Sequence, residues 1–246
     1  MPNHASLDAE GATTRMTIVF QPIVDLHLWR VVGFEALARF ADGAPPPAHL
    51  ARAEAAGSRE ELELDLIRNA VSAAVALPSD AFVTLNASGS TILRPEMAEI
   101  LEPCARPWGL EIYEGATTAS LAAVRERVTG LGGQLLVDDA GAASADEARI
   151  TTLRPDVVKI DRTLFWQVAA DDTARGVLEG LLAAARESGA KILVEGVSDD
   201  DEVERARALG SDLAQGFHLG VPTPAEDVAE MLAELHRRVG VDAPGL

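Results

Sequence analysis

The sequence predicts an α/β fold, a modified TIM-type β/α barrel with an antiparallel first strand. Short segments rich in β-branched residues alternate with longer segments of helical period along the whole chain, a pattern typical of parallel α/β proteins. Eight strands are expected, and a sheet of about eight strands can close into a barrel. Only residues 25–29 separate the first two expected strands. Because a crossover helix needs more residues than this, those two strands should form an antiparallel hairpin.

Each expected strand is a short, mostly apolar run, and each expected helix combines Ala, Leu, Arg and Glu with apolar residues three or four apart. The expected strands are Thr17–Val24, Arg30–Ala36, Phe82–Asn86, Leu110–Tyr113, Gln134–Asp138, Asp156–Ile160, Lys191–Glu195 and a short one near Leu213–Phe217. The expected helices are Ala48–Ala56, Glu60–Ala76, Thr117–Leu131, Ala143–Leu153, Thr173–Ser188, Asp199–Leu209 and Ala225–Val239. Three consecutive prolines mark Ala41–Pro47 as a rigid, non-helical loop after the second strand.

The composition indicates one folded, acidic domain. The 246 residues are 48% hydrophobic and include 21 Lys+Arg against 39 Asp+Glu, a net charge of −18. We expect a single barrel domain over residues 16–240, between a flexible N-terminal tail (1–15) and a C-terminal tail (241–246). A chain this acidic repels phosphate backbones and anionic lipids at long range, so duplex nucleic acid is not an expected partner.

The sequence also predicts a cytoplasmic protein without membrane insertion. Cys104 is the only cysteine, which excludes an internal disulfide and a Cys-rich zinc site and suits a reducing compartment. The first fifteen residues lack the basic and then apolar pattern of a secretory signal. The longest apolar runs, such as Val71–Leu77, are too short to cross a bilayer.

Polar residues close almost every expected strand, at the edge where β/α barrels carry their reactive groups. They are Glu35, Asn86, Glu111 with Glu114, Asp138 with Asp139, Lys159 with Asp161, Glu195, and Gln215. Taken singly, Asn86, Asp139 or Asp161 is explained more simply as a helix N-cap. That explanation fails for the set, because Glu is a poor N-cap and several carboxylates at one barrel mouth repel one another.

These oxygen ligands, with no His or Cys among them, predict a site for Mg²⁺ or Mn²⁺. The adjacent Asp138 and Asp139 suit a bridge between two ions about 3.5–4 Å apart. Lys159 is one of only two lysines beside 19 arginines, and its compact ammonium could hold a water or a phosphate oxygen. Two alternatives remain open: Lys159 as a purely structural ion pair, and an unrelated barrel enzyme that uses one Mg²⁺ for enolate chemistry. The second does not explain the adjacent aspartates.

Short motifs surround these strand-end residues in a fixed order. They are Phe20-Gln21-Pro22-Ile23-Val24, Gly33-Phe34-Glu35-Ala36-Leu37-Ala38-Arg39, Leu85-Asn86, Glu111-Ile112-Tyr113-Glu114, Asp138-Asp139, Lys159-Ile160-Asp161, Glu195-Gly196-Val197 and Gln215-Gly216-Phe217. In order and spacing, over about residues 18–224, the chain resembles the EAL-domain family, whose members hydrolyse cyclic di-GMP. No cyclase or sensor segment is seen before it, so a stand-alone domain is expected.

The resemblance implies a metal-dependent phosphodiesterase on a barrel with an antiparallel strand. Two Mg²⁺ or Mn²⁺ ions would be bound, one by Glu35, Asn86, Glu111 and Asp138, the other by Asp138, Asp139 and Glu195. The implied catalytic residues are Glu35, Lys159, Asp139 and Glu195, with Lys159 and Asp139 positioning the attacking water, and the implied substrate contacts are Gln21, Arg39 and Gln215. The implied product is linear pGpG.

Two departures from the family pattern weaken the expected activity. Where the family usually reads Phe-Gly-Thr-Gly-Tyr-Ser after the paired aspartates, this chain reads Ala140-Gly141-Ala142-Ala143-Ser144-Ala145, a degenerate loop that Glu114 would help to hold. Ser198 stands where the family has a glutamate. An alternative function is therefore a weak or inactive EAL domain that binds cyclic di-GMP or a regulatory protein. A homodimer is also compatible with the resemblance.

Overall fold

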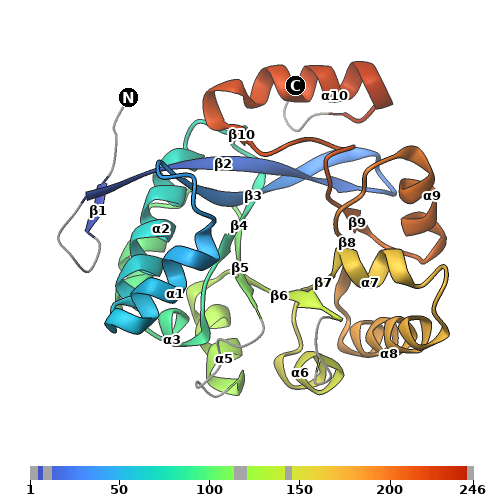
Figure 1. The fold of residues 1–246 in the computed structure, drawn as a ribbon, viewed down its shortest axis with the longest axis horizontal. Coiled ribbons are helices and arrows are strands. Elements are labelled where there is room, and N and C mark those ends of the chain that lie inside the picture. The colour runs from blue at the N-terminus through green and yellow to red at the C-terminus, as the bar shows by residue number, and fades with distance from the viewer. Residues whose placement is uncertain (1–4, 8–12, 114–120, 142–145, 243–246) are drawn as a thin grey trace.

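The computed structural model describes residues 5–7, 13–113, 121–141 and 146–242. Its barrel strands are β2 (Thr13–Asp25), β3 (Arg30–Phe40), β4 (Phe82–Asn86), β5 (Trp108–Ile112), β6 (Gln134–Ala140), β7 (Val157–Ile160), β8 (Lys191–Val194) and β9 (Leu213–Ala214). Two short strands, β1 (Ala5–Leu7) and β10 (Thr223–Pro224), add to β2 outside the ring. Figure 1 shows the ring of strands with helices around it.

The sheet order confirms the predicted modified TIM barrel. β2 and β3 pair in antiparallel fashion, with Phe20 opposite Ala36, whereas β3 through β9 are parallel neighbours. An antiparallel pairing of β9 with β2, Val24 opposite Ala214, closes the ring. The antiparallel first strand follows from the short connection, because the four residues between β2 and β3 are too few for a crossover helix.

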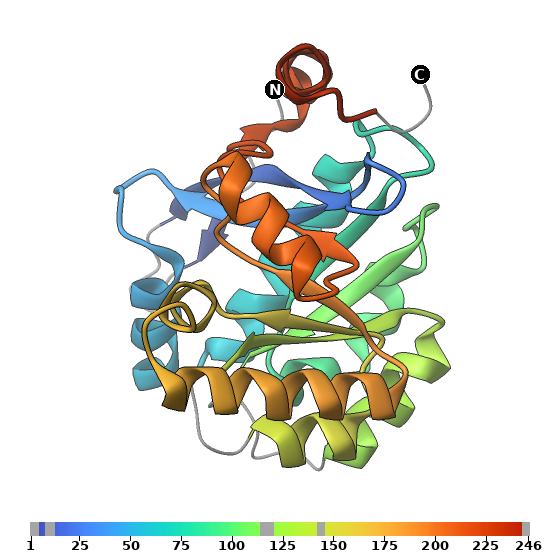
Figure 2. The same cartoon turned by 90° about the vertical axis from the view of Figure 1, so that its right-hand side faces the viewer.

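The helices cover the outside of the ring. They are α1 (Pro46–Ala56), α2 (Arg59–Ala74), α3 (Gly89–Ile92), α4 (Glu96–Leu101), α5 (Leu121–Leu131), α6 (Asp146–Leu153), α7 (Arg162–Gln167), α8 (Asp172–Ser188), α9 (Asp200–Ala208) and α10 (Val228–Val239), the last preceded by the 3₁₀ turn η1 (Ala225–Asp227). Figure 2 shows α8 along one side of the barrel and α10 on the opposite side. Within the described residues, no helix combines the length and the apolar composition that a membrane crossing requires.

Two differences from the sequence expectation concern short segments. The prediction that Ala41–Pro47 is entirely non-helical is wrong, because α1 begins at Pro46 with proline in its first turn. Proline is tolerated there, since the first N–H groups of a helix have no partner inside it. The short helices α3, α4 and α7 were not expected, because four to six residues are too few to show a helical period.

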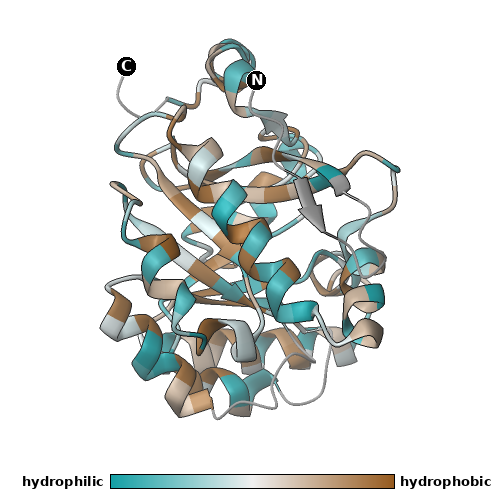
Figure 3. Cartoon of the chain, turned by 90° about the vertical axis from the view of Figure 1, so that its left-hand side faces the viewer, coloured by the Kyte–Doolittle hydropathy of each residue, from teal (hydrophilic) through white to brown (hydrophobic). Residues whose placement is uncertain are grey.

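Inside the barrel, an apolar layer supports the end that carries the polar residues. Ile23, Leu136, Val157, Leu193 and Leu213 come from different strands and form one buried cluster. A larger cluster lies between the strands and the helices. Figure 3 shows hydrophobic colour along the central strands, whereas the helices around them alternate between hydrophilic and hydrophobic colour. Because side chains alternate along a strand, residues two positions after this inner layer point into the barrel again.

Candidate active site

The candidate site is the polar layer that follows the apolar layer inside the barrel. Asp138, Lys159, Glu195 and Gln215 each stand two positions after a member of the inner apolar cluster, and Glu35, Asn86 and Glu111 join them from β3, β4 and β5. The structure therefore brings together these seven of the residues that the strand-end pattern singled out. The physical cause is the period of two along each strand combined with the common direction of β3 to β9.

Lys159 lies at the centre of this layer and is 1% exposed. Its Nζ donates hydrogen bonds to Glu111 Oε2 at 2.6 Å and to Glu35 Oε2 at 3.4 Å. It also forms ion pairs with Asp138 Oδ1 at 2.8 Å and Glu195 Oε1 at 2.9 Å. Burial alone lowers the pKa of Lys159, but the surrounding carboxylates, Asp138 foremost, raise it well above the ordinary value. Lys159 is therefore a fixed ammonium.

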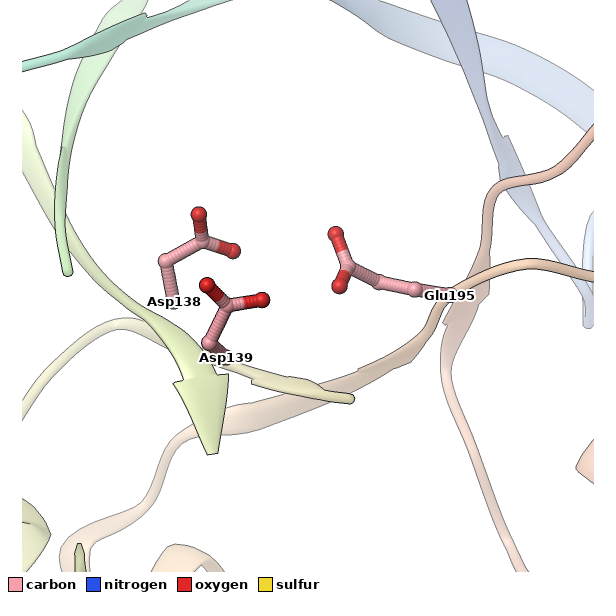
Figure 4. A group of neighbouring side chains, drawn as sticks. All are labelled: Asp138, Asp139 and Glu195. Carbon is pink, nitrogen blue, oxygen red and sulfur yellow. The ribbon is translucent and has the colours of Figure 1, made fainter. Parts of the chain in front are cut away.

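A β-bulge places the carboxylates of Asp138 and Asp139 on the same side of the strand. The register between β6 and β7 shifts between Val137 and Ala140, and Asp139 has a φ of 52°. In a regular strand two neighbouring side chains would point to opposite faces. A left-handed φ on a residue with a Cβ costs on the order of 1–2 kcal/mol, although Asp and Asn tolerate it best. Figure 4 shows the resulting convergence with Glu195.

Asp138, Asp139 and Glu195 each offer a carboxylate oxygen within 4.8 Å of the others. Burial, reinforced by the charge of Asp138, raises the pKa of Asp139 to about 6. Burial also raises the pKa of Glu195 to about 8, against the opposing effect of Lys159. The three carboxylates repel one another at this distance, and a further cation among them would reduce that repulsion.

Glu111 is fully buried, and its two oxygens have different surroundings. Oε2 accepts the hydrogen bond from Lys159, whereas Oε1 has no hydrogen-bond partner in the described part of the protein. Burial, followed by the charge of Glu35, raises the pKa of Glu111 well above its ordinary value. A buried carboxylate oxygen without a donor is costly, and a cation would relieve that cost.

The three expected substrate contacts occupy two different settings. Gln215 Nε2 donates to Glu35 Oε2 at 2.8 Å and to Gln21 Oε1 at 3.2 Å, and Gln21 Nε2 donates to the Gly220 carbonyl at 3.1 Å. Both glutamines are buried and orient Glu35. Arg39 is exposed, and its Nη1 donates a hydrogen bond to the Ala38 carbonyl at 2.9 Å.

The N-cap alternative applies to one of the three residues for which it was considered. Asp161 caps α7 by accepting from the N–H groups of Thr163 and Leu164. Asn86 instead donates from Nδ2 to Glu35 Oε1 at 3.1 Å, while Ser88 caps the following helix. Asp139 does not cap a described helix but converges with the carboxylates of Asp138 and Glu195. An N-cap needs a helix directly after the residue, and the strand-end pattern alone does not show where the next helix begins.

The predicted degenerate loop lies partly outside the described residues, as does Glu114. Ala140 is the last residue of β6 and is fully buried, and the N–H of Gly141 donates to Asp146 Oδ2 at 2.7 Å. Residues 142–145 are not described. At the other departure, Ser198 donates from N and Oγ to Glu202 Oε2 at 2.6 and 2.8 Å. A carboxylate therefore stands beside Ser198 one helical turn further along.

A second polar group near the site was not anticipated from the sequence. Glu63 on α2 is 2% exposed and accepts hydrogen bonds from the N–H of Ser88, the hydroxyl of Tyr113 and Nε of Arg59. The sequence signal that could have revealed Glu63 is its position on the helix. Glu63 falls on the same helix face as the buried Ile67 and Ala70, where a charged residue needs a specific partner.

Comparison with known proteins decides the family. The EAL-domain family matches residues 5–222, most of the chain. This chain belongs to the EAL-domain family. An uncharacterised protein of Azorhizobium caulinodans is 28% identical to this EAL chain over 244 residues, covering 90% of this chain and 33% of that protein.

One further relative carries a function in its name, and one similar solved structure names its ligands. The cyclic di-GMP phosphodiesterase RocR of Pseudomonas aeruginosa is 26% identical over 226 residues, covering 84% of the EAL chain and 57% of RocR. Klebsiella pneumoniae BlrP1, solved in a complex with manganese and cyclic di-GMP, aligns with a TM-score of 0.74 and 24% identity over 85% of this chain and 56% of BlrP1. At this identity the structural match shows the shared fold. The EAL chain spans about a third of the first relative and little more than half of RocR.

Proposed function

We propose that this EAL domain hydrolyses cyclic di-GMP to linear pGpG with the help of two divalent cations, Mg²⁺ or Mn²⁺. The observation that carries the proposal is the convergence of Asp138, Asp139 and Glu195, with oxygens within 4.8 Å, beside the Lys159 cluster. Support also comes from the family and from RocR, which is named a cyclic di-GMP phosphodiesterase. The site would operate in the cytoplasm, as the single cysteine suggests.

The donor atoms present fit two hard divalent cations. Glu35, Asn86, Glu111 and Asp138 would bind one ion, and Asp138, Asp139 and Glu195 the other. Among the residues that the structure describes, one ammonium, that of Lys159, faces four carboxylates, and Glu111 Oε1 has no hydrogen-bond donor. Oxygen ligands of this kind are those that Mg²⁺ and Mn²⁺ prefer. When bound, such a pair of ions supplies a water of lowered pKa and neutralises charge on a phosphate.

The chain's own residues position the reacting groups. Gln21 and Gln215 hold Glu35 in one orientation through a chain of hydrogen bonds that ends at the Gly220 carbonyl. Lys159 retains its proton, so its role is to orient oxygen atoms and balance charge rather than to accept a proton. Asp139 and Glu195 converge with Asp138 and would serve as metal ligands, and Asp139 together with Lys159 would position the attacking water. Arg39 at the rim would grip a phosphate through its planar fork.

One observation favours a second function, binding of cyclic di-GMP without useful turnover. Lys159 already pairs with Glu35, Glu111, Asp138 and Glu195, so the pocket has partial charge compensation without a metal. A pocket held in this way can receive a ligand even when its metal affinity is low.

A single assay separates the two functions. Purified protein is incubated with cyclic di-GMP and Mg²⁺ or Mn²⁺, and pGpG is followed by chromatography, while calorimetry measures binding in parallel. Glu35→Gln serves as the site variant and Glu99→Gln, an exposed carboxylate on α4, as the matched control. We expect metal-dependent pGpG formation that Glu35→Gln removes and Glu99→Gln preserves. Binding without product formation supports the second function. If the protein shows no binding and forms no product, both functions are contradicted.

A further inference from the structure

Backbone hydrogen bonds join neighbouring strand ends at the level of the carboxylates. The N–H of Ala87 donates to the Glu111 carbonyl at 3.0 Å, which joins the end of β4 to β5. The N–H of Glu195 donates to the Ile160 carbonyl at 3.2 Å, which joins the end of β8 to β7. At these two junctions the sheet itself sets the distance between the side chains that follow each strand.

The junction between β5 and β6 is different. The pairing of these strands ends with Ile112 opposite Val137, directly before Asp138. The pairing of β6 with β7 is interrupted after Val137 and resumes at Ala140. In the register of the described strands, Asp138 and Asp139 therefore have no partner on β5 or β7. Contacts other than the sheet pairing must hold this bulge in place.

Two charged side chains of α6, Asp146 and Arg149, connect the two strand ends at this junction. Asp146 Oδ2 accepts a hydrogen bond from the N–H of Gly141 at 2.7 Å, directly after the last residue of β6. Asp146 Oδ1 lies 3.6 Å from Arg149 Nη1. Nη2 of Arg149 donates to the carbonyl of Ile112, the last residue of β5. The Asp146–Arg149 pair thus links the end of β5 to the end of β6.

Both members of the pair are buried, with side chains 3% exposed for Asp146 and 9% exposed for Arg149. Charged residues are rarely buried to this extent unless they are paired, and solvent ions screen a buried pair only weakly. Asp146 also lies in the first turn of α6, where the helix dipole favours a carboxylate. The pair is therefore a stiff connection rather than a surface contact.

Gly141 is the point at which the pair holds the chain beyond the bulge. Its φ is 107°, a conformation that residues with a Cβ rarely adopt, and a Cβ at this position would collide with the side chain of Leu164 on α7. The backbone of Gly141 consequently lies close against α7 and directs its N–H toward Asp146. The segment is fixed on both sides, two residues after Asp139.

We propose that Asp146 and Arg149 are positioning residues for the metal site. Their ion pair holds the bulge of Asp138 and Asp139 at a set distance from Glu111, and both side chains act through backbone groups at a strand end. Without the pair, the bulge shifts relative to β5 and the ions bind more weakly. This inference rests on the proposed function, because it takes the carboxylates of the bulge as metal ligands.

The test measures the affinity of the full chain for Mn²⁺ by calorimetry without substrate. In parallel, the pGpG assay gives kcat as a function of Mn²⁺ concentration and KM for cyclic di-GMP at saturating Mn²⁺. Asp146→Ala removes both contacts of the carboxylate, whereas Asp146→Asn keeps an oxygen for the N–H of Gly141 and loses the charge. Arg149→Met removes the link to Ile112 with a side chain of similar length.

Asp156→Ala is the matched control, at the opposite end of β6. Asp156 Oδ2 accepts from the N–H of Leu135 at 2.8 Å and pairs with Arg125 Nη1 at 2.6 Å. It therefore makes the same two kinds of contact, but at the start of β6, away from the carboxylate layer. Urea denaturation of each variant separates a change in stability from a change in metal affinity.

We expect Asp146→Ala and Arg149→Met to weaken Mn²⁺ binding by about tenfold or more, within the range for losing a group that supports a metal ligand. The Mn²⁺ concentration for half-maximal kcat should rise by a similar factor, while KM for cyclic di-GMP stays within about threefold of wild type. Asp146→Asn should lose less affinity than Asp146→Ala. Asp156→Ala should bind Mn²⁺ like the wild type even where its stability is lower.

Two results would overturn the inference and leave the proposed function intact. One is an unchanged Mn²⁺ affinity in folded Arg149→Met. The other is an equal loss of Mn²⁺ affinity in Asp156→Ala and in the Asp146 variants, which would make the loss a general consequence of lower stability. If Asp146→Ala does not fold, Asp146→Asn is judged by the same criteria. By contrast, a wild-type protein that neither binds Mn²⁺ nor forms pGpG contradicts the proposed function itself.

Discussion

The ammonium of Lys159 lies 2.6 Å from the carboxylate of Glu111, and neither side chain is more than 1% exposed. Lys159 stands two positions after Val157, a member of the inner apolar cluster, so the pair lies deep in the polar layer. Removing one partner of a buried ion pair leaves the other charge without compensation, which generally costs more than the pair itself contributes. The pair is therefore a sensitive point for both stability and activity.

Lys159→Met should lower the free energy of unfolding by about 3–5 kcal/mol at pH 8, because four carboxylates then lose their shared cation. Urea denaturation with and without Mn²⁺ measures this effect, and Mn²⁺ should restore part of the loss. Lys191→Met, which removes the other lysine at an exposed strand start, is the control. A Lys159→Met protein as stable as wild type would show that the cluster adjusts by taking up protons.

Glu35→Ala and Asp138→Ala should each reduce hydrolysis of cyclic di-GMP by more than about 100-fold, because each removes a proposed metal ligand. Arg39→Ala should instead raise KM and leave kcat within a few-fold, since Arg39 is exposed at the rim. Steady-state kinetics in Mn²⁺ distinguishes the two classes. If Glu35→Ala keeps a rate within a few-fold of wild type, the ligand assignment is wrong.

Metal should stabilise the fold more at high pH than at low pH. The pKa of Asp139 is raised to about 6 and that of Glu195 to about 8, whereas unfolded carboxyls titrate near 4. Folding without metal therefore takes up protons between about pH 4 and 8, and stability from these groups falls as pH rises through that window. A divalent cation needs the deprotonated ligands, so it compensates most above the raised pKa values.

The measurement is the melting temperature in EDTA and in Mn²⁺ from pH 5 to pH 8. The rise caused by Mn²⁺ should be largest at pH 8 and small at pH 5. Glu195→Gln should reduce this pH dependence, because it removes the group with the higher pKa. An equal rise at both ends of the range would contradict the assignment of these carboxyls as metal ligands.

Asp139 is expected to respond differently to two substitutions because of its φ of 52°. Asn tolerates a left-handed backbone, so Asp139→Asn should change unfolding free energy by less than about 0.5 kcal/mol while lowering hydrolysis at least about tenfold. Asp139→Val should lower the unfolding free energy by about 1–2 kcal/mol more than Asp139→Asn, since a β-branched residue is strained at this φ. Thermal melts and the pGpG assay check both variants. Equal stability of the two would show that the bulge relaxes.

Several features of this protein follow from the sequence alone because they depend on local periodicity. The alternation of strand and helix segments predicted the barrel, and the short connection of residues 25–29 predicted the antiparallel hairpin. The polar residue at each strand end predicted which residues would gather, since parallel strands place their carboxyl ends at one edge. The family motifs agree with the family match over residues 5–222.

The tertiary structure decided what each polar residue contacts. Asp161 and Asp139 both follow apolar runs, yet Asp161 caps α7 while the bulge turns Asp139 toward Glu195. Similarly, nothing in the local sequence links Arg59 to Tyr113, because that contact depends on how α2 packs against the ends of β4 and β5. Strand and helix period specify which face a side chain occupies, whereas its partners across the barrel depend on closure of the whole ring, which couples residues more than a hundred positions apart, such as Glu35 and Lys159.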